Sequence, residues 1–227
     1  MKELNPENWI YWFGLLTTGL MLLPVFIVFA RKQFGADFIA LSIYFVTTFV
    51  YNLLLIAFPN FPATAKRYIG VTNNVLDTPM ILLFLMHFTS SVSIRKIIRI
   101  CLFGFVVFEL GVLLMYGLSF KSISIFSGPG ILLILCFSFY FFTRNVIIAI
   151  NQKIDVAKTM MISGILFAYA VYFMVYLFYY VMETPNKIDA LIIYFLASLV
   201  ASVLLSSGLL KEKKAIKKAI HQTRIAV

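Results

Sequence analysis

Seven long apolar stretches dominate this sequence and restrict what it can fold into. Short charged clusters separate them, and each stretch is long enough for a helix to cross the hydrocarbon core of a bilayer. The apolar residues run continuously instead of alternating, which argues against barrel strands, and a helix satisfies its own backbone groups in lipid. We therefore predict an all-α bundle of seven transmembrane helices. The predicted spans are Trp9–Ala30, Phe38–Phe58, Tyr68–Phe88, Ile97–Phe120, Ile123–Phe142, Met160–Met182 and Ile188–Leu210.

The composition excludes several classes of protein. Hydrophobic residues make up 62% of the chain and charged residues 12%, against about 45–50% and 25% in soluble domains. The net charge of +10 comes from basic residues that flank the apolar spans, so we expect no nucleic-acid partner. Only two histidines are present, and Cys101 and Cys136 lack metal-ligand or redox spacing, so we expect no metal.

The distribution of lysine and arginine predicts the orientation. Fourteen of the 19 basic residues fall at positions 31–32, 95–99, 144–158 and 211–224, on one side of the predicted bundle, and five fall on the other. Because positive residues concentrate in cytoplasmic loops, the N-terminus is expected outside and the C-terminus in the cytoplasm. We interpret the chain as a multi-pass protein of a bacterial-type inner membrane.

Residues 211–227 form a basic tail after the last predicted span. The residues that recur there at roughly helical spacing are Lys213, Lys214, Lys217, Lys218, His221 and Arg224. Such a segment fixes the topology and can also lie on anionic membrane lipid. The alternative is that the tail docks to a cytoplasmic or membrane protein partner. The sequence does not decide whether the protein forms an oligomer.

Asp77 is the most informative polar residue, because it lies deep within the third predicted span. A charge at the bilayer centre costs about 2.5–3.5 kcal/mol on insertion scales, so intramembrane carboxyls usually have a function. Asn73 lies one turn earlier on the same face, and Asn74 is its neighbour. These residues predict a polar stripe toward the bundle interior, either as a ligand or proton site or as hydrogen-bonding contacts between helices.

Glu109, in the fourth predicted span, is a secondary candidate. Its own helix offers no polar partner within one turn. Paired with Asp77 across a pocket, it would suit acid and base chemistry on a lipid or isoprenoid.

The sixth predicted span places Tyr169, Tyr172 and Tyr176 on one face. Such a stripe packs between helices or lines a pocket for a long apolar ligand.

The segment RYIGVTNNVLDTPMILLFL, from Arg67 to Leu85, resembles the third helix of microbial rhodopsins, especially their sodium-pumping branch. In that family an Asn, an Asp and a Gln mark the helix, and the resemblance puts Asn73, Asp77 and Phe84 at those positions. It covers about 15 residues, while seven spans and the predicted orientation agree with the family over the whole chain. The resemblance implies a rhodopsin-like fold.

The seventh span departs from that family. Microbial rhodopsins carry an Asp and, four residues later, the Lys that binds retinal covalently, and here Ser198 and Ser202 fall at those positions. We therefore expect no covalent cofactor. A non-covalent apolar ligand such as a retinoid, carotenoid or lipid stays open.

These observations favour a non-enzymatic sensor, receptor or accessory protein. Its candidate site comprises Asp77, Asn73, Asn74, Ser198, Ser202, Tyr169 and Tyr172. Two alternatives remain open, namely a small membrane enzyme that uses Asp77 and Glu109, and an ion- or proton-coupled carrier.

Overall fold

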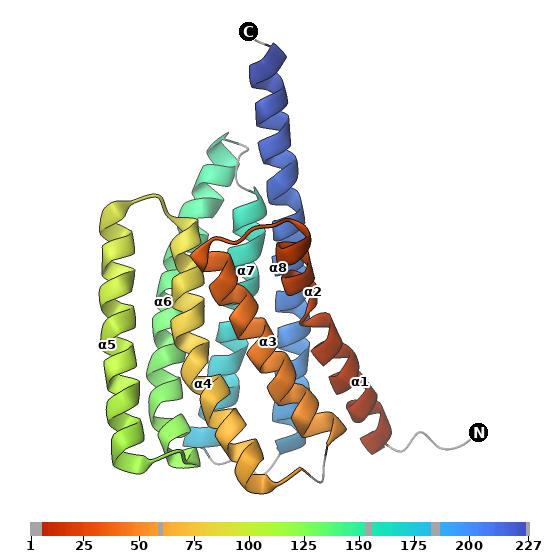
Figure 1. Cartoon of the computed structure of the whole chain (residues 1–227), viewed down its shortest axis with the longest axis vertical. Coiled ribbons are helices and arrows are strands. Elements are labelled where there is room, and N and C mark those ends of the chain that lie inside the picture. Colours follow the sequence, from red (N-terminus) through yellow and green to blue (C-terminus); the bar gives the residue numbers. More distant parts are fainter. Residues whose placement is uncertain (1–5, 59–60, 153–155, 183–186, 226–227) are drawn as a thin grey trace, which may run out of the picture.

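The computed structural model of the chain is built from helices and describes residues 6–58, 61–152, 156–182 and 187–225 (Figure 1). Seven helices within these ranges are long and apolar enough to cross a membrane, which confirms the predicted number of spans. The helices are α1 (Pro6–Leu20), α2 (Leu23–Ala30), α3 (Ala36–Ala57), α4 (Ala63–Leu85), α5 (Val92–Tyr116), α6 (Phe120–Gln152), α7 (Val156–Tyr176) and α8 (Lys187–Ile225). Short helices Met86–Phe88 (η1) and Leu177–Val181 (η2) extend α4 and α7.

The first apolar stretch forms two helices, α1 and α2. Pro24 occupies the first turn of α2. Proline has no N–H to donate, and its ring crowds the carbonyl four residues earlier, so a helix tends to end before it. The chain makes a turn at Met21 and Leu22, where the Leu22 N–H donates to the Gly19 carbonyl.

Two further prolines lie inside helices. Pro79 is within α4 and Pro129 within α6. We predicted the fifth span from Ile123, but the helix begins earlier, at Phe120, and runs through the Ser-Gly-Pro-Gly segment. Gly130 allows a close approach there, since a β-carbon would lie 2.8 Å from the Phe105 ring.

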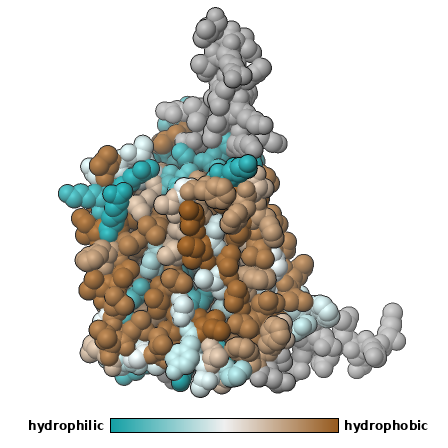
Figure 2. All heavy atoms as spheres, viewed as in Figure 1, coloured by the Kyte–Doolittle hydropathy of each residue, from teal (hydrophilic) through white to brown (hydrophobic). Residues whose placement is uncertain are grey.

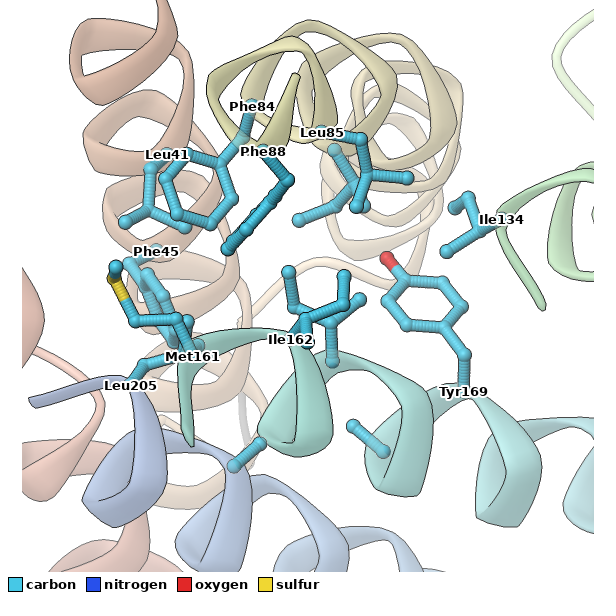
Figure 3. Close-up of a cluster of buried hydrophobic side chains, with 14 of the residues drawn as sticks. Leu41, Phe45, Phe84, Leu85, Phe88, Ile134, Met161, Ile162, Tyr169 and Leu205 are labelled. Carbon is cyan, nitrogen blue, oxygen red and sulfur yellow. The ribbon is translucent and has the colours of Figure 1, made fainter. Parts of the chain in front are cut away.

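The bundle packs most closely between α7 and α8. A β-carbon on Gly208 would lie 2.7 Å from the Ala157 carbonyl oxygen, so this contact requires glycine. The core also draws on α3 and α4, and Figure 3 shows Phe84 and Leu85 facing Met161 and Ile162 of α7. These contacts bury one face of each helix.

The outer surface of the bundle is apolar. Helix α5 exposes large side chains such as Phe103 and Leu114. Figure 2 shows apolar side chains over this face of the bundle, with hydrophilic residues toward the end where α8 leaves it. This distribution fits a surface in contact with lipid.

The described chain starts and finishes at opposite ends of the bundle (Figure 1). Helix α8 continues past the bundle to Ile225, so the seventh span and most of the basic tail form one helix. The apolar span within this helix, Ala190–Glu212, ends close to the predicted Leu210.

Candidate functional site

The interior of the bundle contains a polar network at the level of Asp77. Helices α3, α4, α7 and α8 each contribute side chains to it. The hydrogen-bonded members are Tyr44, Thr48, Asn52, Asn73, Asp77, Tyr169, Tyr172, Tyr194 and Ser198.

Asp77 accepts a hydrogen bond from Tyr169. The phenol hydroxyl of α7 donates to Oδ1 of the α4 carboxyl, although the two residues are 92 positions apart in the chain. Tyr169 is 2% exposed, and Figure 3 shows its ring extending from α7 toward α4. Asp77 is half-buried, so its carboxyl needs a donor to offset its lost hydration, and Tyr169 supplies one.

Tyr172 connects this pair to α8. Its hydroxyl lies 2.6 Å from Ser198 Oγ, and its ring contacts those of Tyr169 and Tyr194 at centroid distances of 5.4 and 5.2 Å. Ser198 also donates to the Tyr194 carbonyl at 2.8 Å. Because Tyr172 is then the donor to Ser198, the two tyrosines of α7 link the α4 carboxyl to α8.

Helix α3 closes the other side of the network. Tyr44 lies within hydrogen-bonding reach of Tyr169 and Tyr172. One turn further, Thr48 Oγ1 donates to Asn73 Oδ1 at 3.3 Å. Asn73 therefore contacts a neighbouring helix, as its stripe predicted, whereas Asn74 donates to the Gly70 carbonyl of its own helix at 2.8 Å.

A small cavity borders the network. It encloses about 20 Å³ and is lined by Tyr44, Tyr169, Tyr172 and Ser198 together with apolar side chains. A buried water needs roughly 10–15 Å³ and two to four polar partners, so this cavity fits a single water molecule.

Ser202 lies one turn beyond Ser198 on α8. Its side chain is 1% exposed, and its hydroxyl has no hydrogen-bond partner among the described residues. Ser206, a further turn along, is equally buried and also lacks a partner within those ranges. The helix thus presents a stripe of small hydroxyl residues to the core.

Glu109 is buried in the contact of α5 with the bundle. It belongs to the inward face of α5, with Phe105 and Val112, and is 1% exposed. Both of its carboxyl oxygens lack a hydrogen-bond partner in the described part of the chain, although the group interacts electrostatically with Asp77.

A second polar cluster, which the sequence did not predict, closes the basic end of the bundle. His87 Nδ1 lies 2.9 Å from Asp37 Oδ2, and His87 Nε2 lies 3.0 Å from Glu212 Oε1. The imidazole packs against the rings of Phe38 and Phe84, at centroid distances of 4.6 and 6.1 Å. One histidine therefore joins α3, the end of α4, and α8.

Arg31 adds another contact with α8. Its Nη2 donates to the Leu210 carbonyl at 2.9 Å, and it interacts electrostatically with Glu212. Burial lowers the pKa of Arg31, and the charge of Glu212 partly offsets this effect. Within the described ranges, no group of three His, Cys, Asp or Glu side chains is arranged to hold a metal ion. The two ring nitrogens of His87 instead contact the carboxyl groups of Asp37 and Glu212.

Comparison of the chain with protein-family models, with curated proteins and with solved structures found no match. The chain is a multi-pass helical membrane protein with seven apolar helices. Its function has to be inferred from the two polar clusters and from the helix that joins them.

Proposed function

We propose that this protein is a non-enzymatic membrane sensor whose α8 relays the state of the Asp77 network to the basic end of the bundle. The observation that carries the proposal is the course of α8. This single helix bears Ser198, which belongs to the network, and Glu212, which belongs to the His87 cluster. The two residues are 14 positions apart, about 21 Å along the axis.

The input to such a sensor is a change at Asp77. Gain or loss of a proton there alters the charge that Tyr169 faces, and the rearranged hydrogen bonds reach Ser198 through Tyr44 and Tyr172. A water in the adjoining cavity would supply a second partner to this chain of hydroxyls. A retinoid or carotenoid is far larger than this cavity and would have to displace the tyrosine rings.

The output is the position of α8 relative to α3 and α4. A packed helix responds to a change at one end by shifting as a unit, since bundle contacts have discrete alternatives. The His87 cluster and Arg31 are the contacts that such a shift would break or reform. The extension of α8 would carry the shift to a protein partner or a lipid surface.

The orientation follows from the charge distribution. With the basic end in the cytoplasm, the N-terminus lies outside and the α8 extension enters the cytoplasm of a bacterial-type cell. The resemblance of α4 to microbial rhodopsins supports the same arrangement. Ser202 at the retinal lysine position supports a member of such a group without a covalent chromophore.

A distance measurement between two spin labels tests the relay. One label replaces Ser93, at the basic end of α5, and the other is placed in α8 beyond Glu212, after Cys101 and Cys136 have been changed to serine. We expect Asp77→Asn and Tyr172→Phe to shift the distance distribution, because each alters the path from α4 to α8.

The matched control is Tyr140→Phe, because Tyr140 is 46% exposed on the outer surface of α6. It should leave the distances at their original values. Unchanged distances in folded Asp77→Asn and Tyr172→Phe proteins would rule out α8 as the relay.

One observation favours the enzymatic alternative. Glu109 has two unpartnered carboxyl oxygens and interacts electrostatically with Asp77. An acid and base pair requires both carboxyls to reach one substrate. Turnover of a lipid or isoprenoid that is lost in both Asp77→Asn and Glu109→Gln would favour that alternative over the sensor.

A further inference from the structure

A groove on the outer surface lies between α2 and α3, on the side of α3 away from the Asp77 network. It encloses about 260 Å³. Val28 and Ser42 are buried at its floor, and the exposed residues of its walls are Phe29, Phe34, Ile39, Ile43 and Val46.

The lining of this groove is chemically apolar. The two hydroxyl groups among its lining residues are both engaged with the backbone of α3. Ser42 Oγ donates to the Phe38 carbonyl at 2.9 Å, and Thr47 Oγ1 donates to the Ile43 carbonyl at the same distance. An occupant therefore gains nothing from polar groups here, and an apolar occupant such as a hydrocarbon chain suits this lining.

The groove has the length of one leaflet. It extends from Phe34, just before α3 begins, to Val46 and Thr47. Val46 is ten residues into α3, about 15 Å along the axis. The hydrocarbon core is about 30 Å thick, so the groove runs from the membrane interface to the midplane. This is the depth that a single acyl chain of one leaflet occupies.

The interfacial end of the groove carries positive charge. Lys32 precedes Phe34 by two residues, is exposed, and has a positive φ of 54°. Arg31 is held on α8 by its bond to the Leu210 carbonyl, whereas Lys32 is an exposed cation two residues before Phe34 in the chain. An ammonium group at this depth suits a phosphate group of a lipid.

We propose that this groove binds an anionic phospholipid, with one acyl chain between α2 and α3 and its phosphate group at Lys32. The acyl chain packs against the apolar lining, and the phosphate pairs with the positive charge of Lys32. The site is independent of the Asp77 network and of the sensor function proposed above.

Native mass spectrometry of the full chain tests the proposal. Protein is taken from bilayers of equal phosphatidylglycerol and phosphatidylcholine into a mild detergent, and the lipids that stay bound are counted. We expect one phosphatidylglycerol per chain in preference to phosphatidylcholine. One basic residue near a membrane surface contributes about 1 kcal/mol, so Lys32→Glu should lower retention of phosphatidylglycerol about fivefold or more.

A second variant tests the acyl chain. Val46→Trp fills the deep end of the groove and should reduce retention of both lipids. The controls are Lys96→Glu, an exposed cation at the same end on α5, and Val107→Trp, an exposed residue on the outer face of α5. Both controls should retain lipid as the unchanged protein does.

Four results would overturn the proposal. The first is equal retention of the two lipids, and the second is retention unaffected by Val46→Trp. The third is binding of soluble glycerol phosphate that matches binding of the lipid, because the acyl chain would then contribute nothing. The fourth is a lipid-free dimer that cross-links through Ile43→Cys, because a second copy would then occupy the groove.

Discussion

His87 Nε2 lies 3.0 Å from Glu212 Oε1, which fastens the end of α4 to α8 across 125 positions of the chain. The other ring nitrogen of His87 lies 2.9 Å from Asp37 at the start of α3. A neutral imidazole has one N–H and can donate to one carboxylate only, whereas the imidazolium donates to two. With both carboxyls ionised, the charged form of His87 is therefore the one that holds three helices together.

This stoichiometry predicts how the contact depends on pH. As the pH rises, the imidazolium loses a proton, one of its two bonds to a carboxylate is lost, and α8 loosens. At a pH low enough to protonate Asp37 or Glu212, that carboxyl loses its charge and its attraction to the imidazolium. Arg31 stays charged throughout and keeps its bond to the Leu210 carbonyl.

Removal of His87 should abolish this dependence on pH. His87→Gln leaves at least one carboxyl unpaired, which we expect to cost about 1–3 kcal/mol in the stability of the α8 contact. The protection of the α8 amides near Leu210 against hydrogen exchange, corrected for the intrinsic pH dependence of amide exchange, should fall accordingly and lose its dependence on pH. The control is His221→Gln at the other histidine of the chain. Unchanged exchange in His87→Gln would show that the cluster does not hold α8.

Tyr169→Phe should destabilise the protein more than a tyrosine on the surface does. It removes the donor to Asp77 and leaves a carboxyl in the interior without that bond, for which about 1–3 kcal/mol is a typical cost. Thermal unfolding in detergent measures the difference. Tyr140→Phe, on the exposed face of α6, should unfold at the temperature of the unchanged protein. Equal unfolding temperatures for the two variants would mean that the bond contributes no stability.

The long apolar runs of the sequence were enough to predict the number of membrane spans and the all-helical fold. Seven spans are evident because each run exceeds the length that a helix needs in lipid. The turn at Met21 and Leu22 was missed, although Pro24 was a visible signal for it. The extension of α8 was missed as well. Charged residues mark the end of a membrane span, but a helix can continue through them.

The contacts of the site were harder to predict. Asp77, Tyr169 and Ser198 were each identified from depth, spacing or resemblance, but the rotation of each helix decides which side chains meet. In the structure Asp77 meets Tyr169, and Ser198 meets Tyr172. The His87 cluster was not predicted because its three residues come from distant parts of the chain. Asp37 lies near the start of α3, and Glu212 lies where α8 leaves the bundle.

The protein should form no covalent adduct with retinal. Ser202 stands where the resemblance to microbial rhodopsins would put the retinal lysine, and its side chain is 1% exposed within a packed core. Incubation with retinal and then borohydride should leave the mass of the protein unchanged, and no red-shifted visible band should develop.

Ser202→Lys adds an amine at that position but not the space for a chromophore. The neighbouring cavity encloses only about 20 Å³, and overpacking of a core costs about 1–3 kcal/mol. We expect a destabilised variant without a visible band. A covalent adduct in the unchanged protein would contradict the expectation.

The orientation is testable by labelling with a membrane-impermeant thiol reagent. In a protein whose Cys101 and Cys136 have been changed to serine, Ser93→Cys lies at the basic end and Leu118→Cys at the other end. The charge distribution predicts that, in intact cells, the reagent reaches Leu118→Cys and not Ser93→Cys. The reverse pattern would place the α8 extension outside the cytoplasm.

Asp77→Asn separates titration of this residue from its hydrogen bonding. The amide keeps the size of the carboxyl and accepts the bond from Tyr169, so the protein should fold nearly normally. Asp77→Leu removes the acceptor too and leaves the Tyr169 hydroxyl without it, at an expected further cost of about 1–3 kcal/mol.

Infrared difference spectroscopy over a pH series follows the carboxyl stretch of a protonated acid directly. A band that depends on pH should disappear in Asp77→Asn and persist in Glu109→Gln, because Asp77 has a hydroxyl partner that responds to its charge. If the band persists in Asp77→Asn and disappears in Glu109→Gln, the titrating group of the interior is Glu109. The unpartnered carboxyl on α5 would then replace the Asp77 network as the input site of the sensor.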